Sequence, residues 1–226
     1  MAITTFFPDP DPESTSVDGS IGLPNVSTWS GIRDATTATA SADGITLSIH
    51  SENETTNKFS VHRAFLLFDT SSIPDGDTID SATTTVTKNT GISENPQTSG
   101  LIQTSPASDT TLVNNDFDNL TLNSPSEATD SRVDMNVADD TDINYVMNAT
   151  GLGFINATGI TKLGIRFTGD IDDVLPPNNT RRFIQVHSVE IAGTNNDPKL
   201  VVTHTSAHLQ GGPTGGAAFS GGVAHF

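Results

Sequence analysis

The sequence predicts an all-β protein, a jelly-roll-like two-sheet β-sandwich with extended N- and C-terminal arms. Residues that favour helices are scarce, and Thr, Ser, Asn, Asp and Gly dominate the spaces between short apolar runs. These runs are numerous enough for eight or more strands, and long polar connections separate them. Their uneven spacing favours a sandwich over a barrel.

Composition divides the chain into three parts. Residues 1–20 form a proline-rich arm, in which PDPDPE is expected to be stiff and extended. Residues 21–205 hold the strand-forming runs and are expected to be the sandwich domain. Residues 206–226 are a glycine-rich tail whose large apolar residues are spaced too irregularly for a strand or a helix.

The clearest strand runs from Val61 to Phe68. Read with period two, both of its faces are apolar apart from Arg63, so we expect this strand inside the structure and not at a rim. A proline-stiffened corner follows at residues 69–76. The alternation over residues 82–87 then predicts a half-exposed strand, the second of a hairpin-like pair.

The middle of the chain carries weaker signals. Residues 89–130 are mostly polar, with only LIQT and DNLTL as strand candidates. The segment DINYVMNATG predicts one short helix, capped by Asp142 and stopped by Gly151, with Ile143, Val146 and Met147 on one face.

Three clear strands follow. TKLGIRF directs Leu163, Ile165 and Phe167 inward and leaves Lys162 and Arg166 outward. RRFIQVHSVEI is apolar on alternate positions in both phases, which predicts a central strand. DPKLVVTHT begins after a proline and places two apolar residues on one face.

Charge and composition exclude several classes of function. The chain of 226 residues has 10 basic and 27 acidic side chains, a formal charge of -17 and no cysteine. Nucleic-acid binding is not expected, because contacts to phosphates require Lys and Arg. No stretch approaches the roughly 20 apolar residues of a membrane helix, and the N-terminus lacks a signal-peptide pattern, so we expect no membrane partner and no secretion signal.

Several sequence motifs follow one another in a recognisable order along the chain. HRAFLLFDTSSIPDGDTIDSATTTV, GLGFINATGITKLGIRFTGDID and NNDPKLVVTHT follow STWSGIR and span about residues 18–205. The order Arg, apolar strand, Phe-Asp-Thr-Ser, Ile-Pro, Thr/Ala-rich strand and final Pro-Lys-Leu-Val-Val strand resembles the DNRLRE-type family of β-sandwich modules. The resemblance implies a jelly-roll-like fold with a non-catalytic role, in carbohydrate binding or as a building block of a surface or virion structure.

Arg63 allows two interpretations. As a functional residue it would offer its guanidinium to a sugar acid or to a neighbouring subunit. As a structural residue it would be buried, with its charge matched by Asp69, Asp170 or Glu190. We favour the structural interpretation, because an unpaired charge on an inner strand would cost several kcal/mol.

No catalytic residue, cofactor or metal site is predicted. The acidic run GDIDD, with Asp170, Asp172 and Asp173, and the pair Asp139 and Asp140 are the candidates for a calcium ion, but neither has EF-hand spacing, and acidic loops are ordinary in so acidic a chain. The six histidines show no zinc-binding spacing, and no serine lies in a nucleophile elbow. Trp29 and Tyr145 are the only residues of their types, so few aromatic rings are on offer for stacking on sugars.

The two ends of the chain predict an assembly role. A proline-rich arm and a tail with scattered large apolar residues cannot easily bury themselves in one domain, and the alternatives are disordered termini or contacts with neighbouring subunits. We favour assembly, with tail contacts made by Leu209, Phe219, Val223 and Phe226.

The leading hypothesis is therefore a non-enzymatic structural subunit of a large assembly, a phage virion protein such as a capsid decoration, a head or collar fibre, or a tail component. It would assemble in the host cytoplasm with copies of itself and other virion proteins. The alternative is a carbohydrate-binding module for acidic polysaccharides at an extracellular surface, where calcium would have to bridge the like charges.

Overall fold

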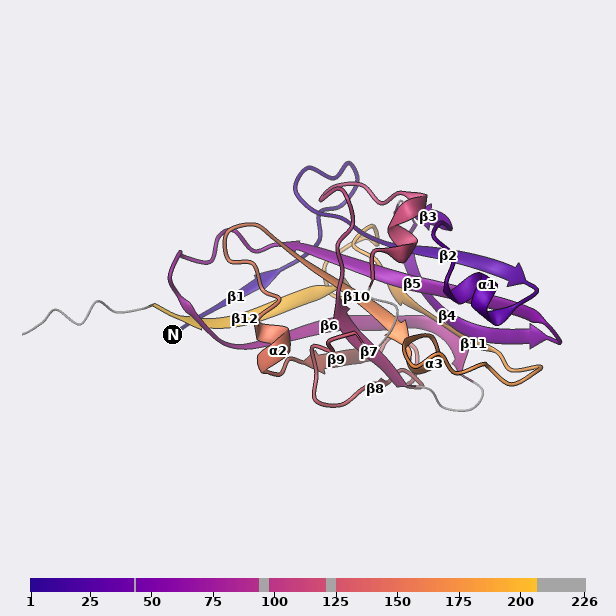
Figure 1. Ribbon diagram of the computed structural model, residues 1–226. Helices are drawn as coiled ribbons and strands as arrows, with labels where there is room; N and C mark the ends of the chain where they lie inside the picture. Colours follow the sequence, from indigo (N-terminus) through magenta and orange to yellow (C-terminus); the bar gives the residue numbers. More distant parts are fainter. Residues whose placement is uncertain (43, 94–97, 121–124, 207–226) are drawn as a thin grey trace, which may run out of the picture.

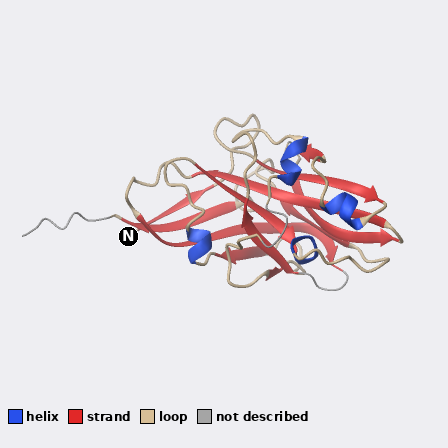
Figure 2. Ribbon diagram, in the orientation of Figure 1, coloured by secondary structure: helices blue, strands red, loops and turns tan. Residues whose placement is uncertain are grey.

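The computed structural model describes residues 1–42, 44–93, 98–120 and 125–206, and its regular secondary structure consists mainly of strands joined by long loops (Figures 1 and 2). The all-β prediction is confirmed. The few helices are single turns, and none of those described is long and apolar enough to span a membrane. The elements are β1 Ala2–Phe6, β2 Asp18–Val26, α1 Trp29–Arg33, β3 Thr39–Ser41, β4 Thr46–Thr55, β5 Lys58–Asp69, β6 Thr78–Ser93, β7 Thr98–Gln103, the 3-10 helix η1 Asn114–Asp118, β8 Val133–Asp134, β9 Asp142–Val146, α2 Ala149–Leu152, β10 Ile160–Phe167, α3 Thr168–Ile171, β11 Arg182–His187 and β12 Lys199–Thr205.

The strands form one strongly curled sheet of 12 strands, not two clearly separate sheets. Its main path runs β1-β12-β6-β11-β4-β5-β10-β7-β8, with β2, β3 and β9 beside it, and the paired strands are antiparallel. The prediction of two clearly separate sheets is therefore wrong: the strands form a half-barrel, because β6 connects its two halves.

Strand β6 joins the two halves of the sheet because it is 16 residues long. Its first part pairs with β12 and β9, and its last part pairs with β11. In its ladder with β11 and again in its ladder with β12, β6 carries one extra residue, which shifts the register as a β-bulge does. Gly91 permits the close approach of β11: its φ is +137°, and a Cβ there would lie 2.3 Å from the Phe183 carbonyl oxygen.

Strand β5 is buried on both faces, as its period-two pattern predicts. Ala64, Leu66 and Phe68 face the core inside the curl, together with residues of β4, β10, β11 and β12. Phe65 and Leu67 face a second core, which they share with Ile21 of the neighbouring strand β2 and which α1 and η1 cover. This covering layer decides the environment of every residue on the second face.

Strands β5 and β6 are not a hairpin-like pair, although they follow one another in sequence. β5 pairs with β2, β4 and β10, whereas β6 pairs with β9, β11 and β12. The corner between them therefore carries the chain from one half of the sheet to the other.

The predicted helix at residues 142–151 is wrong for most of its length. Residues Asp142–Val146 form β9, in which Ile143 and Tyr145 are buried and the alternate residues are exposed. The helical turn starts later, at α2, where the Asn148 side-chain oxygen accepts a hydrogen bond from the Gly151 N–H at 2.9 Å. The alternation of β-branched and aromatic residues outweighs the cap signal of Asp142.

The strands predicted near the C-terminus are present. β11 lies between β6 and β4, in a central position, and β12 buries Leu200 and Val202 on one face. The first 20 residues do not form a separate arm: Ala2–Phe6 is strand β1, which pairs with β12, and β2 begins at Asp18. The end of β12 lies beside the start of β1, because His204 is paired with Ala2 (Figure 1).

Candidate functional site

Three buried arginines converge on one aspartate beneath the second core. Arg63 comes from β5, Arg166 from the end of β10, Arg33 from α1, and Asp170 from α3. All four side chains are 0–2% exposed. Arg166 was expected to point outward, and this expectation is wrong: its side chain is buried, because α3 follows β10 and places Asp170 against the Arg166 guanidinium.

The Asp170 carboxylate accepts hydrogen bonds from the guanidinium groups of Arg63 and Arg166. Arg63 donates from Nε at 2.9 Å and from Nη2 at 2.8 Å, and Arg166 donates from Nε at 2.7 Å and from Nη2 at 2.9 Å. Arg63 also donates to the carbonyl oxygens of Phe117 and Arg33, and its guanidinium lies 4.0 Å from the centre of the Phe117 ring. Arg63 is thus fully engaged inside the protein, and Asp170 is the partner among the three carboxylates considered for it.

Burial alone would raise the pKa of Asp170, but the charges of Arg63 and Arg166 and their hydrogen bonds outweigh it and hold this pKa well below its usual range. The carboxylate therefore remains ionised in the folded protein. The cluster ties β5, β10, α1 and α3 together, and this is a structural task, since its groups are closed off from solvent.

The three calcium candidates of the GDIDD run interact with different partners. Asp170 is taken by the arginines, Asp172 accepts from Arg132 Nη2 at 2.7 Å, and Asp173 accepts from the indole Nε1 of Trp29 at 2.8 Å. Within the described residues, no group of three or more acidic or histidine side chains is placed to hold a metal ion. The three aspartates of GDIDD thus each bind a different side chain, although they are neighbours in sequence.

The single tryptophan and the single tyrosine are core residues. Trp29 is 9% exposed and packs edge-on against Phe59, and Tyr145 is fully buried with its hydroxyl 2.6 Å from Ser99 Oγ. Burial raises the pKa of the Tyr145 hydroxyl above its usual value. Neither ring offers a surface for stacking on a sugar.

The surface feature that stands out is the edge formed by β1. In the part of the chain that the structure describes, β1 pairs with β12 on one side only, so the backbone of its other side is open. The sequence AITTF carries no charge, and Ile3 is 69% exposed. Thr4 Oγ1 lies 3.1 Å from His204 Nε2, and His204 Nδ1 lies 2.7 Å from Asp77 Oδ2, which fixes the strand to the body.

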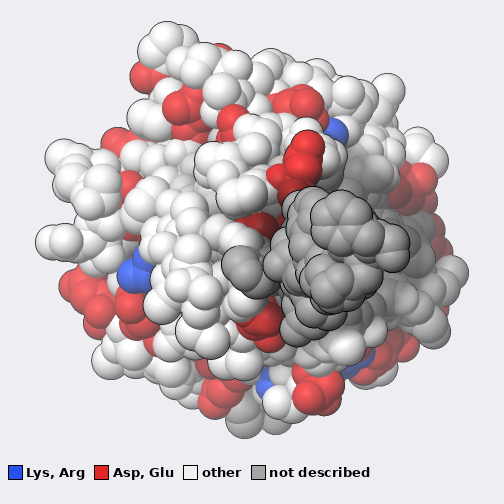
Figure 3. Space-filling view, turned by 90° about the vertical axis from the view of Figure 1, so that its left-hand side faces the viewer, with Lys and Arg blue, Asp and Glu red and all other residues white. Residues whose placement is uncertain are grey.

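An uncharged open edge of this kind is a template for pairing with another strand. Sequence reasoning missed it because residues 1–20 were treated as one arm. The surface around this end of the molecule is acidic: Asp and Glu are spread across it, and Lys and Arg are sparse (Figure 3). The predicted assembly residues Leu209, Phe219, Val223 and Phe226 lie outside the described residues.

The chain matches no family model and no curated protein. The resemblance to the DNRLRE-type family therefore stays a prediction from the quoted motifs.

Proposed function

We propose that the protein is a non-enzymatic structural subunit of a large assembly, a phage virion component such as a capsid decoration, a head or collar fibre, or a tail protein. Copies of itself and other virion proteins are the proposed partners, and the virion, assembled in the host cytoplasm, is the proposed location. We also propose that the curled sheet is a variant of the jelly-roll-like sandwich, since strands from both of its halves enclose one core.

The observation that carries this proposal is the open edge of β1. A five-residue strand without a charged side chain lacks the lysine that commonly protects edge strands. Prolines begin only after it, at Pro8. The edge is also rigid, because β1 is hydrogen-bonded to β12 along its length and Phe6 is buried. A rigid edge presents its backbone groups to an incoming strand at little cost in conformational entropy.

Ile3→Lys tests this proposal. A lysine on the open edge is expected to abolish higher-order assembly, because strand addition would bury its charge. It should change the free energy of unfolding by less than about 0.5 kcal/mol, since Ile3 is exposed. Sedimentation and electron microscopy would measure the assembly, at low and at high salt because acidic copies repel one another.

Ile45→Lys is the matched control, since Ile45 is 60% exposed and precedes β4, away from the β1 edge. It should assemble like the wild type. A wild-type protein that stays monomeric at high concentration and high salt, or an Ile3→Lys variant that assembles normally, would overturn the proposal.

The alternative of a carbohydrate-binding module finds no specific support in the described residues. Trp29 and Tyr145 are buried, and Arg63 and Arg166, the cations that such a module would offer to an acidic sugar, are closed within the cluster at Asp170.

A further inference from the structure

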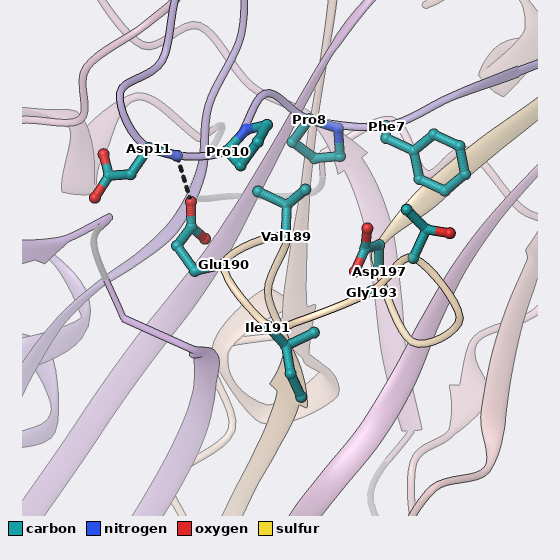
Figure 4. A pocket seen from close by; sticks show the side chains of 10 residues that line it. Phe7, Pro8, Pro10, Asp11, Val189, Glu190, Ile191, Gly193 and Asp197 are labelled. Carbon is teal, nitrogen blue, oxygen red and sulfur yellow. Dashed lines mark hydrogen bonds between the residues drawn. The ribbon is translucent and has the colours of Figure 1, made fainter.

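A pocket of about 460 Å³ lies between the segment that follows β1 and the loop that joins β11 to β12 (Figure 4). Its lining combines two kinds of side chain, apolar ones that include Phe7, Pro8 and Ile191, and the acidic Asp11, Glu190 and Asp197. The two segments are joined by the Asp11 backbone N–H, which donates to Glu190 Oε1 at 3.2 Å. The pocket is thus a built feature of the fold, with apolar walls and acidic groups among them.

The acidic groups keep unused acceptor atoms. Asp197 lines the pocket and is 3% exposed, yet its Oδ1 has no hydrogen-bond partner among the described residues. The second oxygen of Glu190, Oε2, is also buried and unpartnered there. Nearby, the 1% exposed Asp18 accepts from the Val189 backbone N–H through Oδ2 at 3.1 Å and leaves Oδ1 without a partner.

The carboxylates of Asp18, Glu190 and Asp197 repel one another, and burial limits their contact with water. Burial raises the pKa of Asp18, Glu190 and Asp197, and the charge of Glu190 adds to the effect on the other two. The charge of Asp197 likewise adds to the rise at Asp18, and that of Asp11 to the rise at Glu190. A cation placed among them would relieve this repulsion.

The protein's own basic side chains at this place are directed elsewhere. His187 on β11 and Lys199 on β12 lower the pKa of Asp197 through their charges. However, the Lys199 ammonium lies 3.7 Å from Asp142, and His187 Nε2 lies 3.3 Å from Asp140. Neither side chain donates a hydrogen bond to Glu190 Oε2 or Asp197 Oδ1.

We propose that this pocket binds a primary alkylammonium group, with the ammonium at Glu190 and Asp197 and its hydrocarbon stem against Phe7, Pro8 and Ile191. An ammonium has three N–H donors for the unpartnered carboxylate oxygens, and a methylene stem packs well on apolar walls. A metal ion fits less well, because among the described residues no three ligating side chains are close enough to hold one.

A primary alkylammonium group can come from two sources, a lysine side chain of another protein or a free amine. The site does not depend on the β1 edge, and it goes beyond the proposed function: Ile3→Lys leaves every lining residue in place, so the two proposals fail separately.

Calorimetric titration of the full chain with n-hexylamine tests the proposal. Binding is expected, whereas n-hexanol, with the same stem but no charge, and tetramethylammonium, with charge but no N–H donor, should bind at least about tenfold more weakly. Comparison of Nα-acetyl-lysine methylamide with cadaverine then shows which source the pocket prefers. Absence of hexylamine binding, or hexanol binding of equal strength, would overturn the proposal.

Asp197→Asn should weaken hexylamine binding by about tenfold or more, because it removes one charged acceptor. Asp75→Asn, at an exposed turn between β5 and β6, changes the net charge equally and should leave binding unchanged. Asp197→Asn also removes repulsion, so it should remain folded. Should it nevertheless unfold, Glu190→Gln keeps the acceptor for the Asp11 N–H and gives the same readout. Unaltered binding by a folded variant of either kind would contradict the proposed position of the ammonium.

Discussion

Asp170→Asn is expected to lower the free energy of unfolding by about 3–5 kcal/mol, the usual cost of removing one member of a buried ion pair. The amide carries no charge, so the guanidinium groups of Arg63 and Arg166 would remain buried without a counter-charge. Burial leaves them no access to water as a substitute, since both are 0% exposed. Denaturant unfolding followed by circular dichroism would measure the change.

Asp172→Asn is the control from the same acidic run. Asp172 is partly exposed and pairs with Arg132 near the surface, so its loss should cost at most about 1 kcal/mol. An Asp170→Asn variant that is no less stable than Asp172→Asn would contradict the role of the cluster.

The contribution of Asp170 to stability also has a defined pH dependence. Its pKa is lower in the folded protein than in the unfolded chain, where it is about 3.9. The stabilisation is therefore fully present above that value and is lost as the pH falls through the folded-state pKa. The difference between wild type and Asp170→Asn should accordingly stay constant from neutral pH down to about pH 5 and shrink only in stronger acid.

Deletion of residues 206–226 is expected to leave a folded protein that no longer assembles. The last strand, β12, ends at Thr205, so the deletion removes no strand of the described sheet and no residue of either core. It does remove Leu209, Phe219, Val223 and Phe226, the apolar residues proposed to contact neighbouring subunits. Thermal unfolding would check the fold, and light scattering would check the assembly.

A full-length variant with serine at these four positions separates apolar contacts from tail length. It should fail to assemble in the same way as the truncation. Assembly of the truncated chain like that of the wild type would refute the role of the tail, whereas the Ile3→Lys result would still stand on its own.

The strongest sequence signals were those of strands buried on both faces. The run from Val61 to Phe68 is apolar in both phases, and its short length and the turn residues that follow it favour a strand with packed layers on either side. The same logic predicted that Arg63 would be internal and paired. It could not select Asp170 over Asp69 or Glu190, because that choice depends on how β10 and α3 fold back onto β5.

The predictions from sequence failed where contacts between distant parts of the chain determine whether a residue is buried or exposed. Arg166 alternates with Ile165 and Phe167, so it was correctly placed on the opposite face, but nothing local shows that α1, η1 and α3 bury that face. The acidic pocket joins residues 7–11 to residues 189–197, and no pattern along the chain connects them. The open edge of β1 was equally invisible, since the pairing of residues 2–6 with β12 is a contact between the two ends of the chain.

The position of β12 has a mechanical consequence. A pull applied through the C-terminal tail would enter the body at Thr205, along the axis of a strand held between β1 and β6. Backbone hydrogen bonds in antiparallel ladders lie across the strands, so such a force would load both ladders in shear, with many bonds sharing it at once. A body anchored in this way resists tension far better than one whose last strand could be peeled off bond by bond.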